Sequence, residues 1–203
     1  MPDTDVSAFN TSEGTVAASA TRFVTAARPA ATTLTMANTT TGSVGARIVV
    51  VTQGSDDDDK TVTLTGTDVY GTAQTETVTL TGGAGGTVNT TKYFTTVTAG
   101  STSARPDGNI SVGTTTSFAV PVGTNRRMRL KSHSIVSGGT AGNVDYVDGT
   151  PEAGTTRIVA RAIGTADTTS DYYIPDDGVL FENGIVAKST VDVADFLQIY
   201  YTG

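Results

Sequence analysis

Threonine alternates with branched apolar residues along much of the chain, and this pattern restricts the fold more than any other feature. The clearest case is the pair of segments 61–66 (TVTLTG) and 75–80 (TETVTL). A period of two places Val62 and Leu64 on one face of a strand and threonine on the other. Side chains branched at Cβ favour strands because they pack well on a pleated surface. The two segments therefore predict a β-hairpin with one apolar face and one threonine-coated face.

Composition extends this expectation to the whole chain of 203 residues. Threonine and glycine together make up nearly a third of it, and cysteine and tryptophan are absent. Threonine favours strands and glycine favours turns, so we expect an all-β protein. The absence of cysteine excludes disulfides and zinc–thiolate sites. The single histidine, His133, rules out an ordinary transition-metal site, and we expect it to be structural because Ser132 and Ser134 would lie on the opposite strand face.

Short strand-like segments recur about every ten residues between Gly, Asp and Asn clusters, which is the rhythm of a β-sandwich. The expected strands are 33–37, 46–52, 60–67, 74–81, 92–99 and 109–113, then 117–122, 127–136, 143–147, 156–162, 171–174, 178–181, 185–188 and 195–201. Thr114–Thr116 is interpreted as a linker. We therefore predict two small β-sandwich domains, immunoglobulin-like or jelly-roll-like, over residues 32–115 and 116–203. Residues 1–31 lack period-two alternation and are expected to form an extended N-terminal arm. A short helix is the alternative, because Val16, Ala20, Phe23, Val24 and Ala27 fall at helical spacing.

Three loops carry distinctive residues. Asn183-Gly184 between two apolar segments predicts a tight hairpin, because a type I′ turn needs positive φ at both central positions. The run 82–86 (GGAGG) lacks the ending of a phosphate-binding loop and is expected to be a flexible hairpin loop. Asp56–Asp59 is expected to be a solvated turn between strands 46–52 and 60–67. An ordered Ca²⁺ at these four carboxylates remains the alternative.

The acidic residues offer only weak grounds for catalysis. Paired carboxylates can hydrolyse glycosides, and the local candidates are Asp145 with Asp148, Asp176 with Asp177, and Glu182. No tryptophan platform accompanies them, and the Asp176–Asp177 pair follows Pro175 as turn residues do. We therefore expect no enzymatic activity, no cofactor and no metal.

Charge indicates which partners suit the chain. The net charge is −7, which argues against nucleic acid as the main partner. No apolar run is long enough for a membrane span, and the acidic start MPDTDVSAFN does not resemble a secretory leader. The one basic cluster is Arg126, Arg127, Arg129 and Lys131, which is either a solvated strand face or a docking surface for an acidic neighbour.

Several segments resemble the immunoglobulin-like modules of tailed-bacteriophage virion proteins. They are 60–68 (KTVTLTGTD), Gly71, 75–80 (TETVTL), 92–98 (KYFTTVT) and 110–113 (ISVG). Segments 172–185 (YYIPDDGVLFENGI) and 197–203 (LQIYYTG) are similar to parts of small phage structural proteins. Together the resemblance covers roughly residues 45 to 203. It implies a structural protein that carries no catalytic residues, associates with itself and docks on other virion proteins.

The function that follows from the resemblance is a capsid decoration or cement protein on the virion surface. It is expected to form a trimer and to bind the major capsid protein or another virion protein. The arm residues Arg22, Phe23 and Arg28 are candidate contacts, as is the basic cluster. A tail, neck or fibre component is the close alternative. A module that binds host-surface glycans is the other, with stacking platforms chosen from Tyr172, Tyr173, Tyr200 and Tyr201.

Overall fold

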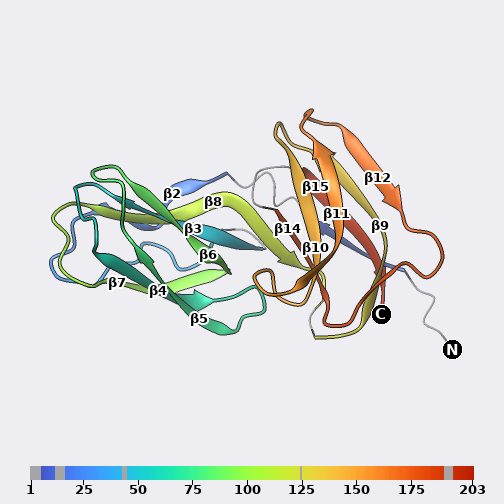
Figure 1. Ribbon diagram of the computed structural model, residues 1–203, viewed down its shortest axis with the longest axis horizontal. Coiled ribbons are helices and arrows are strands. Elements are labelled where there is room, and N and C mark those ends of the chain that lie inside the picture. Colours follow the sequence, from blue (N-terminus) through green and yellow to red (C-terminus); the bar gives the residue numbers. More distant parts are fainter. Residues whose placement is uncertain (1–5, 12–16, 43–44, 124, 190–193) are drawn as a thin grey trace. The chain divides into compact units, whose positions relative to one another are not determined.

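The computed structural model describes residues 6–11, 17–42, 45–123, 125–189 and 194–203. Strands make up 61% of the chain and the described residues contain no helix, which confirms the all-β prediction. The chain forms two compact units. The terminal unit contains Met1–Val16 and Thr116–Gly203, and the inserted unit contains Ala17–Thr115 (Figure 1).

The inserted unit is a sandwich of two antiparallel sheets. One sheet has the order β2 (Ser19–Ala27), β8 (Ile110–Pro121, first part), β3 (Ala46–Gln53) and β6 (Thr87–Phe94). The other has the order β5 (Ala73–Thr79), β4 (Thr61–Thr67) and β7 (Thr96–Thr102). The core between them contains Phe23, Val49, Leu64, Phe94 and Ile110, all fully buried.

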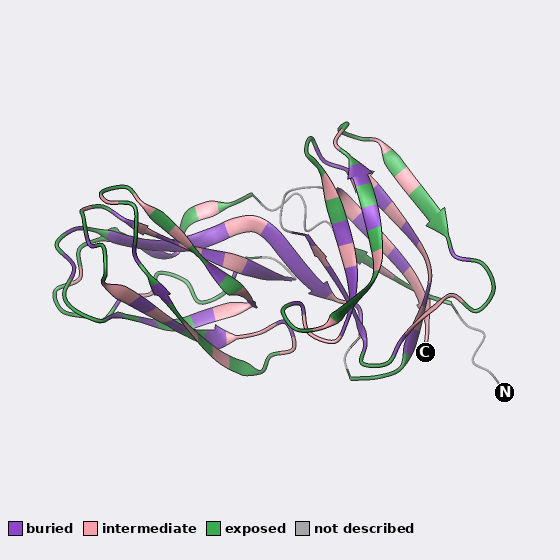
Figure 2. Ribbon diagram, in the orientation of Figure 1, coloured by how far each residue is buried: buried purple, intermediate pink, exposed green. Residues whose placement is uncertain are grey.

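The hairpin predicted from the threonine pattern is present in this unit. Strands β4 and β5 pair antiparallel, with Val62 opposite Val78 and Thr63 opposite Thr77. Val62 is fully buried, whereas the threonine hydroxyls of residues 63 and 77 lie 2.9 Å apart on the outer face. Such cross-strand pairs each stabilise a sheet by a few tenths of a kcal/mol up to about 1 kcal/mol. Figure 2 shows the resulting alternation of burial along the strands.

The terminal unit is also a sandwich. One sheet has the order β1 (Ser7–Thr11), β15 (Ala194–Thr202), β9 (Met128–Ser137) and β12 (Thr169–Tyr173), and β13 (Val179–Phe181) also pairs with β9. The other has the order β11 (Thr155–Ile163), β10 (Ala141–Asp148), β14 (Ile185–Ser189) and the last part of β8. The core between the sheets includes Phe118, Ile135, Tyr146, Phe181 and Leu197.

The N-terminal segment differs from the arm that the sequence predicts. Its described residues contain two paired strands: β1 pairs with β15, from Ser7 opposite Tyr201 to Thr11 opposite Leu197, and β2 pairs with β8. Phe23 and Val24 of β2 are buried in the core of the inserted unit. Burial of these apolar side chains outweighs the weak strand signal of the surrounding Ala and Thr residues.

Three further expectations are corrected. Thr114–Thr116 is not a linker but the middle of β8, as the strand preference of threonine allows. The expected strand 92–99 divides at Thr95 into β6 and β7, which belong to different sheets. Residues 33–37 form only an isolated bridge, between Thr33 and Ser101.

The Asn183-Gly184 turn does not close a hairpin. Gly184 has a φ of +99°, but Asn183 is not in the left-handed region. The flanking strands separate, since β13 pairs with β9 while β14 pairs with β10 and β8. The Asn183 backbone amide instead donates to the buried carboxylate of Asp148 at 2.8 Å, which holds the turn in a different conformation.

No helix among the described residues is long and apolar enough to cross a membrane.

Candidate binding surfaces

The predicted basic cluster lies at the start of β9 in the terminal unit. Arg126 and Arg127 are exposed and precede the strand, whereas Arg129 and Lys131 are half-buried within it. Met128 and Leu130 point into the core, as the alternation predicts. Lys131 Nζ donates to the backbone carbonyl of Asp176 at 3.1 Å, so part of the cluster is already engaged within the chain.

A shallow pocket of about 260 Å³ lies between the arginines of this cluster. Arg127 and Arg129 line it together with Met128 and Leu180. The guanidinium Nε of Arg127 is 3.4 Å from the carboxylate of Glu182, and the two side chains are 65% and 52% exposed. Exposed ion pairs of this kind contribute at most about 1 kcal/mol, so a partner's carboxylate could replace Glu182 at little cost. The surface combines cations with an apolar floor.

The three predicted arm residues have different surroundings. Phe23 is fully buried, so its side chain offers no surface to a partner. Arg22 Nε donates to the carbonyl of Thr40 at 2.8 Å, and Arg28 Nε donates to the carbonyl of Pro106 at 2.9 Å. Both arginines therefore anchor β2 and the residues after it to other parts of the inserted unit.

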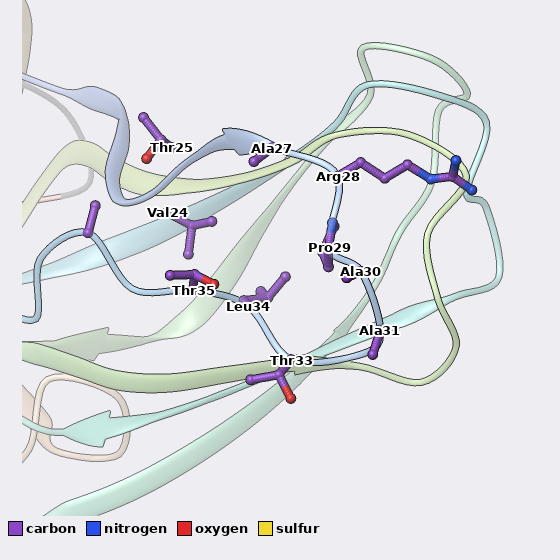
Figure 3. A pocket seen from close by; sticks show the side chains of 11 residues that line it. Val24, Thr25, Ala27, Arg28, Pro29, Ala30, Ala31, Thr33, Leu34 and Thr35 are labelled. Atoms are coloured by element: carbon purple, nitrogen blue, oxygen red, sulfur yellow. The ribbon is translucent and has the colours of Figure 1, made fainter.

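A larger pocket, of about 550 Å³, lies between β2 and the segment that follows it. Figure 3 shows Val24, Leu34 and Thr35 at this pocket, with Arg28 extending away from them. Most of the remaining lining consists of alanine and threonine. This pocket offers few groups that could bind a polar ligand, because Arg28 is the only charged residue in its lining and donates to the Pro106 carbonyl.

The Asp56–Asp59 run is not simply a solvated turn, because Asp57 is 1% exposed. Its carboxylate accepts hydrogen bonds from the backbone amides of Asp107 at 2.7 Å and Gly108 at 3.3 Å. Lys60 Nζ lies 2.6 Å from the same carboxylate and 2.7 Å from that of Asp107. Burial alone raises the pKa of Asp57, but the amide of Asp107 and the Lys60 ammonium outweigh burial and hold that pKa below its usual value.

Asp58 ties a second loop to the same place. Its carboxylate accepts from Gln53 Nε2 at 2.7 Å and from the backbone amide of Gly83 at 3.1 Å, and these bonds lower the pKa of Asp58. Gln53 is fully buried and its Nε2 also lies 2.8 Å from the Gly83 carbonyl. The glycine-rich run 82–86 is therefore held by side chains, and it joins strands of two different sheets rather than forming the expected hairpin.

Asp148 plays the same part in the terminal unit. It is 5% exposed, pairs with Arg157 at 2.9 Å and accepts from the backbone amides of Glu182 and Asn183. Burial alone raises the pKa of Asp148. The hydrogen bonds from the Glu182 amide, Arg157 and Asn183 together outweigh burial, so the pKa lies below its usual value. Both buried carboxylates thus serve as anchors for loops. Within the described ranges, no three acidic or histidine side chains gather as a metal site would require.

A third pocket, of about 460 Å³, opens between the edge strands β11 and β12 of the terminal unit. His133 lines it and is 4% exposed. The His133 ring stacks with two tyrosine rings: Tyr146 at a centroid distance of 5.2 Å and an angle of 25°, and Tyr172 at 5.7 Å and 21°. Burial lowers the pKa of His133 to about 4, although the carboxylate of Asp171 opposes this, so the imidazole is neutral at pH 7.

The four tyrosines considered as platforms differ in position. Tyr172 is 56% exposed and lines the pocket, whereas Tyr173 is 72% exposed and is not part of the lining. Tyr200 and Tyr201 are half-buried on β15, and Tyr201 packs against the core.

Sequence reasoning missed the residues that organise these sites. Asp57, Asp148 and His133 meet several of their partners through contacts between distant segments, for which the sequence has no local pattern. One signal was present: Tyr172 and His133 occupy segments with strand periodicity, and Tyr172 lies opposite His133 once β12 pairs with β9.

The chain matches no family model, and no curated protein or solved structure shows significant similarity to it.

Proposed function

We propose that this protein is a structural component of a tailed-bacteriophage virion, of the decoration or cement type, that binds the major capsid protein on the head. The family resemblance of its threonine-rich segments supplies the setting. The observation that carries the proposal is the pocket bracketed by Arg127 and Arg129 on a chain of net charge −7. A local cationic surface on an acidic protein favours an acidic neighbour and directs how the two proteins dock.

The pocket between Arg127 and Arg129 would contribute to binding affinity as well as to the orientation of the docked partner. Met128 and Leu180 form its apolar part, so an aliphatic side chain of the neighbour would be removed from water there. Each Å² of apolar surface buried contributes roughly 25 cal/mol before the costs of association. The guanidinium groups on either side fit a carboxylate next to that aliphatic side chain. The expected partner is a capsid segment in which an acidic residue stands next to an aliphatic one.

Rigid loops suit a protein that must bridge neighbours. In the inserted unit Asp57 joins the β3–β4 and β7–β8 connections, and in the terminal unit Asp148 joins β10 to the β13–β14 turn. Loops fixed in this way lose little conformational freedom on binding, which favours affinity. We also propose that the protein associates with itself as a trimer. Light scattering on the purified protein should then give a mass of about three chains.

Copy number in purified particles tests the proposal. Quantitative mass spectrometry should find hundreds of copies for each particle, with density on the outer surface of the head in a reconstruction. A count of about twelve or fewer would assign the protein to the tail or neck. Its absence from particles would overturn a virion role.

A charge reversal tests the surface. Arg127→Glu should weaken binding to capsids at least tenfold at moderate salt. Arg105→Glu is the matched control, because Arg105 is exposed in the inserted unit and, among the described residues, its side chain bonds only to the Pro29 carbonyl, at 3.4 Å. Equal binding by both variants would show that the basic cluster is not the docking surface.

A further inference from the structure

We infer that the pocket between β11 and β12 binds a pyranose sugar that carries a carboxylate, with the sugar ring on Tyr172 and the carboxylate paired with Arg161. This pocket shares no lining residue with the one between Arg127 and Arg129. The inference therefore adds a ligand site to the proposed virion role and does not depend on it.

The aromatic platform is built into the fold. Tyr172 is held parallel to His133, which is in turn stacked on the fully buried Tyr146. One face of the Tyr172 ring is therefore occupied by His133, and the side chain is still 56% exposed. An exposed aromatic face that is already fixed costs little conformational entropy when a ligand stacks on it. The C–H face of a pyranose ring fits such a surface.

The cation of the pocket is available for a ligand. Arg161 is exposed on β11 and has no ion-pair partner within the described part of the chain. Arg157 lies four residues earlier on the same strand, but its guanidinium is engaged by Asp148 at 2.9 Å. A free guanidinium pairs with a carboxylate through two parallel hydrogen bonds. One unpaired cation fits a ligand with one negative charge.

The remaining polar groups fit sugar hydroxyls. Ser170 contributes a hydroxyl to the lining, and the imidazole of His133 is neutral at pH 7. His133 Nδ1 is buried and has no hydrogen-bond partner. An unpaired buried nitrogen costs free energy, which a hydroxyl group of the ligand would recover. Neutral groups that both donate and accept are suited to hydroxyls rather than to a second charge.

The size and charge of the site agree with this ligand. A volume of about 460 Å³ is within the range of small-molecule pockets, and Ile158 and Val159 supply the apolar part of the lining. The exposed carboxylate of Asp171 lies close enough to act on His133. Together with the net charge of −7, it disfavours ligands with several negative charges, such as phosphorylated compounds.

Ligand-observed saturation-transfer NMR on the full chain tests the inference, with methyl glucuronide as the acidic sugar and methyl glucoside as the uncharged match. We expect transfer to the ring protons of the glucuronide and an affinity at least tenfold higher than for the glucoside. A hyaluronan hexasaccharide that binds more tightly than methyl glucuronide would identify a polysaccharide chain as the natural source, and equal binding would identify a single acidic sugar. No transfer, equal affinity for the two methyl glycosides, or equally tight binding of benzoate would overturn the inference.

Variants locate the site. Tyr172→Ala and Arg161→Gln should each weaken binding of methyl glucuronide at least tenfold, whereas Tyr172→Phe should retain it. The matched controls are Tyr173→Ala and Arg126→Gln, which remove an exposed tyrosine and an exposed arginine of the same unit from outside the pocket. Thermal unfolding confirms that each variant folds. Equal losses in the test and control variants would contradict the assignment.

Discussion

The carboxylate of Asp57 accepts a hydrogen bond of 2.7 Å from the backbone amide of Asp107, fifty residues later in the chain. This bond joins the connection between β3 and β4 to the connection between β7 and β8, and each of these connections links one sheet of the inserted unit to the other. Lys60 lies between the two carboxylates and neutralises part of their charge. Four adjacent aspartates would repel one another in an extended loop. Here Asp57 instead connects two segments that each link the sheets.

Substitution of Asp57 should destabilise the inserted unit. Asp57→Ala leaves the amides of Asp107 and Gly108 without an acceptor and removes a partner from Lys60. We expect a loss of about 2 to 4 kcal/mol in the free energy of unfolding, measured by urea denaturation. Asp56→Ala changes an exposed neighbour and should cost less than about 0.5 kcal/mol. Similar losses for the two variants would show that burial of Asp57 has no special role.

Asp148 should be equally important in the terminal unit. Asp148→Ala removes the acceptor for two backbone amides and leaves Arg157 unpaired, so we expect a loss of about 2 to 4 kcal/mol. Asp145→Ala, on the same strand and half-buried, is the matched control. The wild-type contribution is complete well above the ordinary value of 3.8 and is lost as the pH falls through the lowered pKa of Asp148. A variant whose stability equals that of the control would contradict the anchoring role.

The stability of the terminal unit should depend on pH through His133. Its folded-state pKa of about 4 is below the ordinary value of 6.5, so the unfolded chain binds more protons between these two pH values. Stability is therefore complete above pH 6.5 and falls as the pH decreases toward 4, by up to about 3 kcal/mol. His133→Phe keeps a ring between the two tyrosines and should remove this slope from unfolding curves recorded between pH 4 and 7. A slope that persists in the variant would assign it to other groups.

A methyl group at Gly66 should disrupt the sheet that contains β4. A Cβ there would lie 1.8 Å from the carbonyl oxygen of Thr96 on the paired strand β7, so the strands would have to move apart. Overpacking of this kind costs roughly 1 to 3 kcal/mol or more. Gly66→Ala should therefore lower the thermal midpoint by several degrees. Gly139→Ala, where a Cβ meets nothing within 4 Å, should leave the midpoint unchanged.

The sequence predicts most strands because buried and exposed residues alternate within each strand, and this alternation is visible in a short segment. Val62, Leu64 and Val78 alternate with threonine, and β4 and β5 pair in the expected way. Periodicity does not predict that Thr114–Thr116 lies within β8, because a run of one residue type shows no alternation, although threonine itself prefers strands. The two strands of the N-terminal segment were missed because their burial depends on β8 and β15, which are distant in sequence.

The candidate sites were predictable only in part. Sequence spacing placed Met128 and Leu130 inside the protein beside Arg129, because alternation along one strand is a local property. Residues of β9, β11 and β12 together line the pocket at His133. The periodicity of a single strand does not predict which strands are its neighbours. No local pattern marks Asp57 or Asp148 as an acceptor for distant backbone amides, because the same residue type in the same kind of segment can equally face water.

The pairing of β1 with β15 has a consequence for synthesis on the ribosome. Chains fold as they emerge, from the N-terminus onward. All described strands of the inserted unit are available once β8 has emerged, whereas β1 must wait for β15 before it can pair. The inserted unit should therefore reach its native state while the first strand is still without its partner. The terminal unit should therefore complete its fold later than the inserted unit.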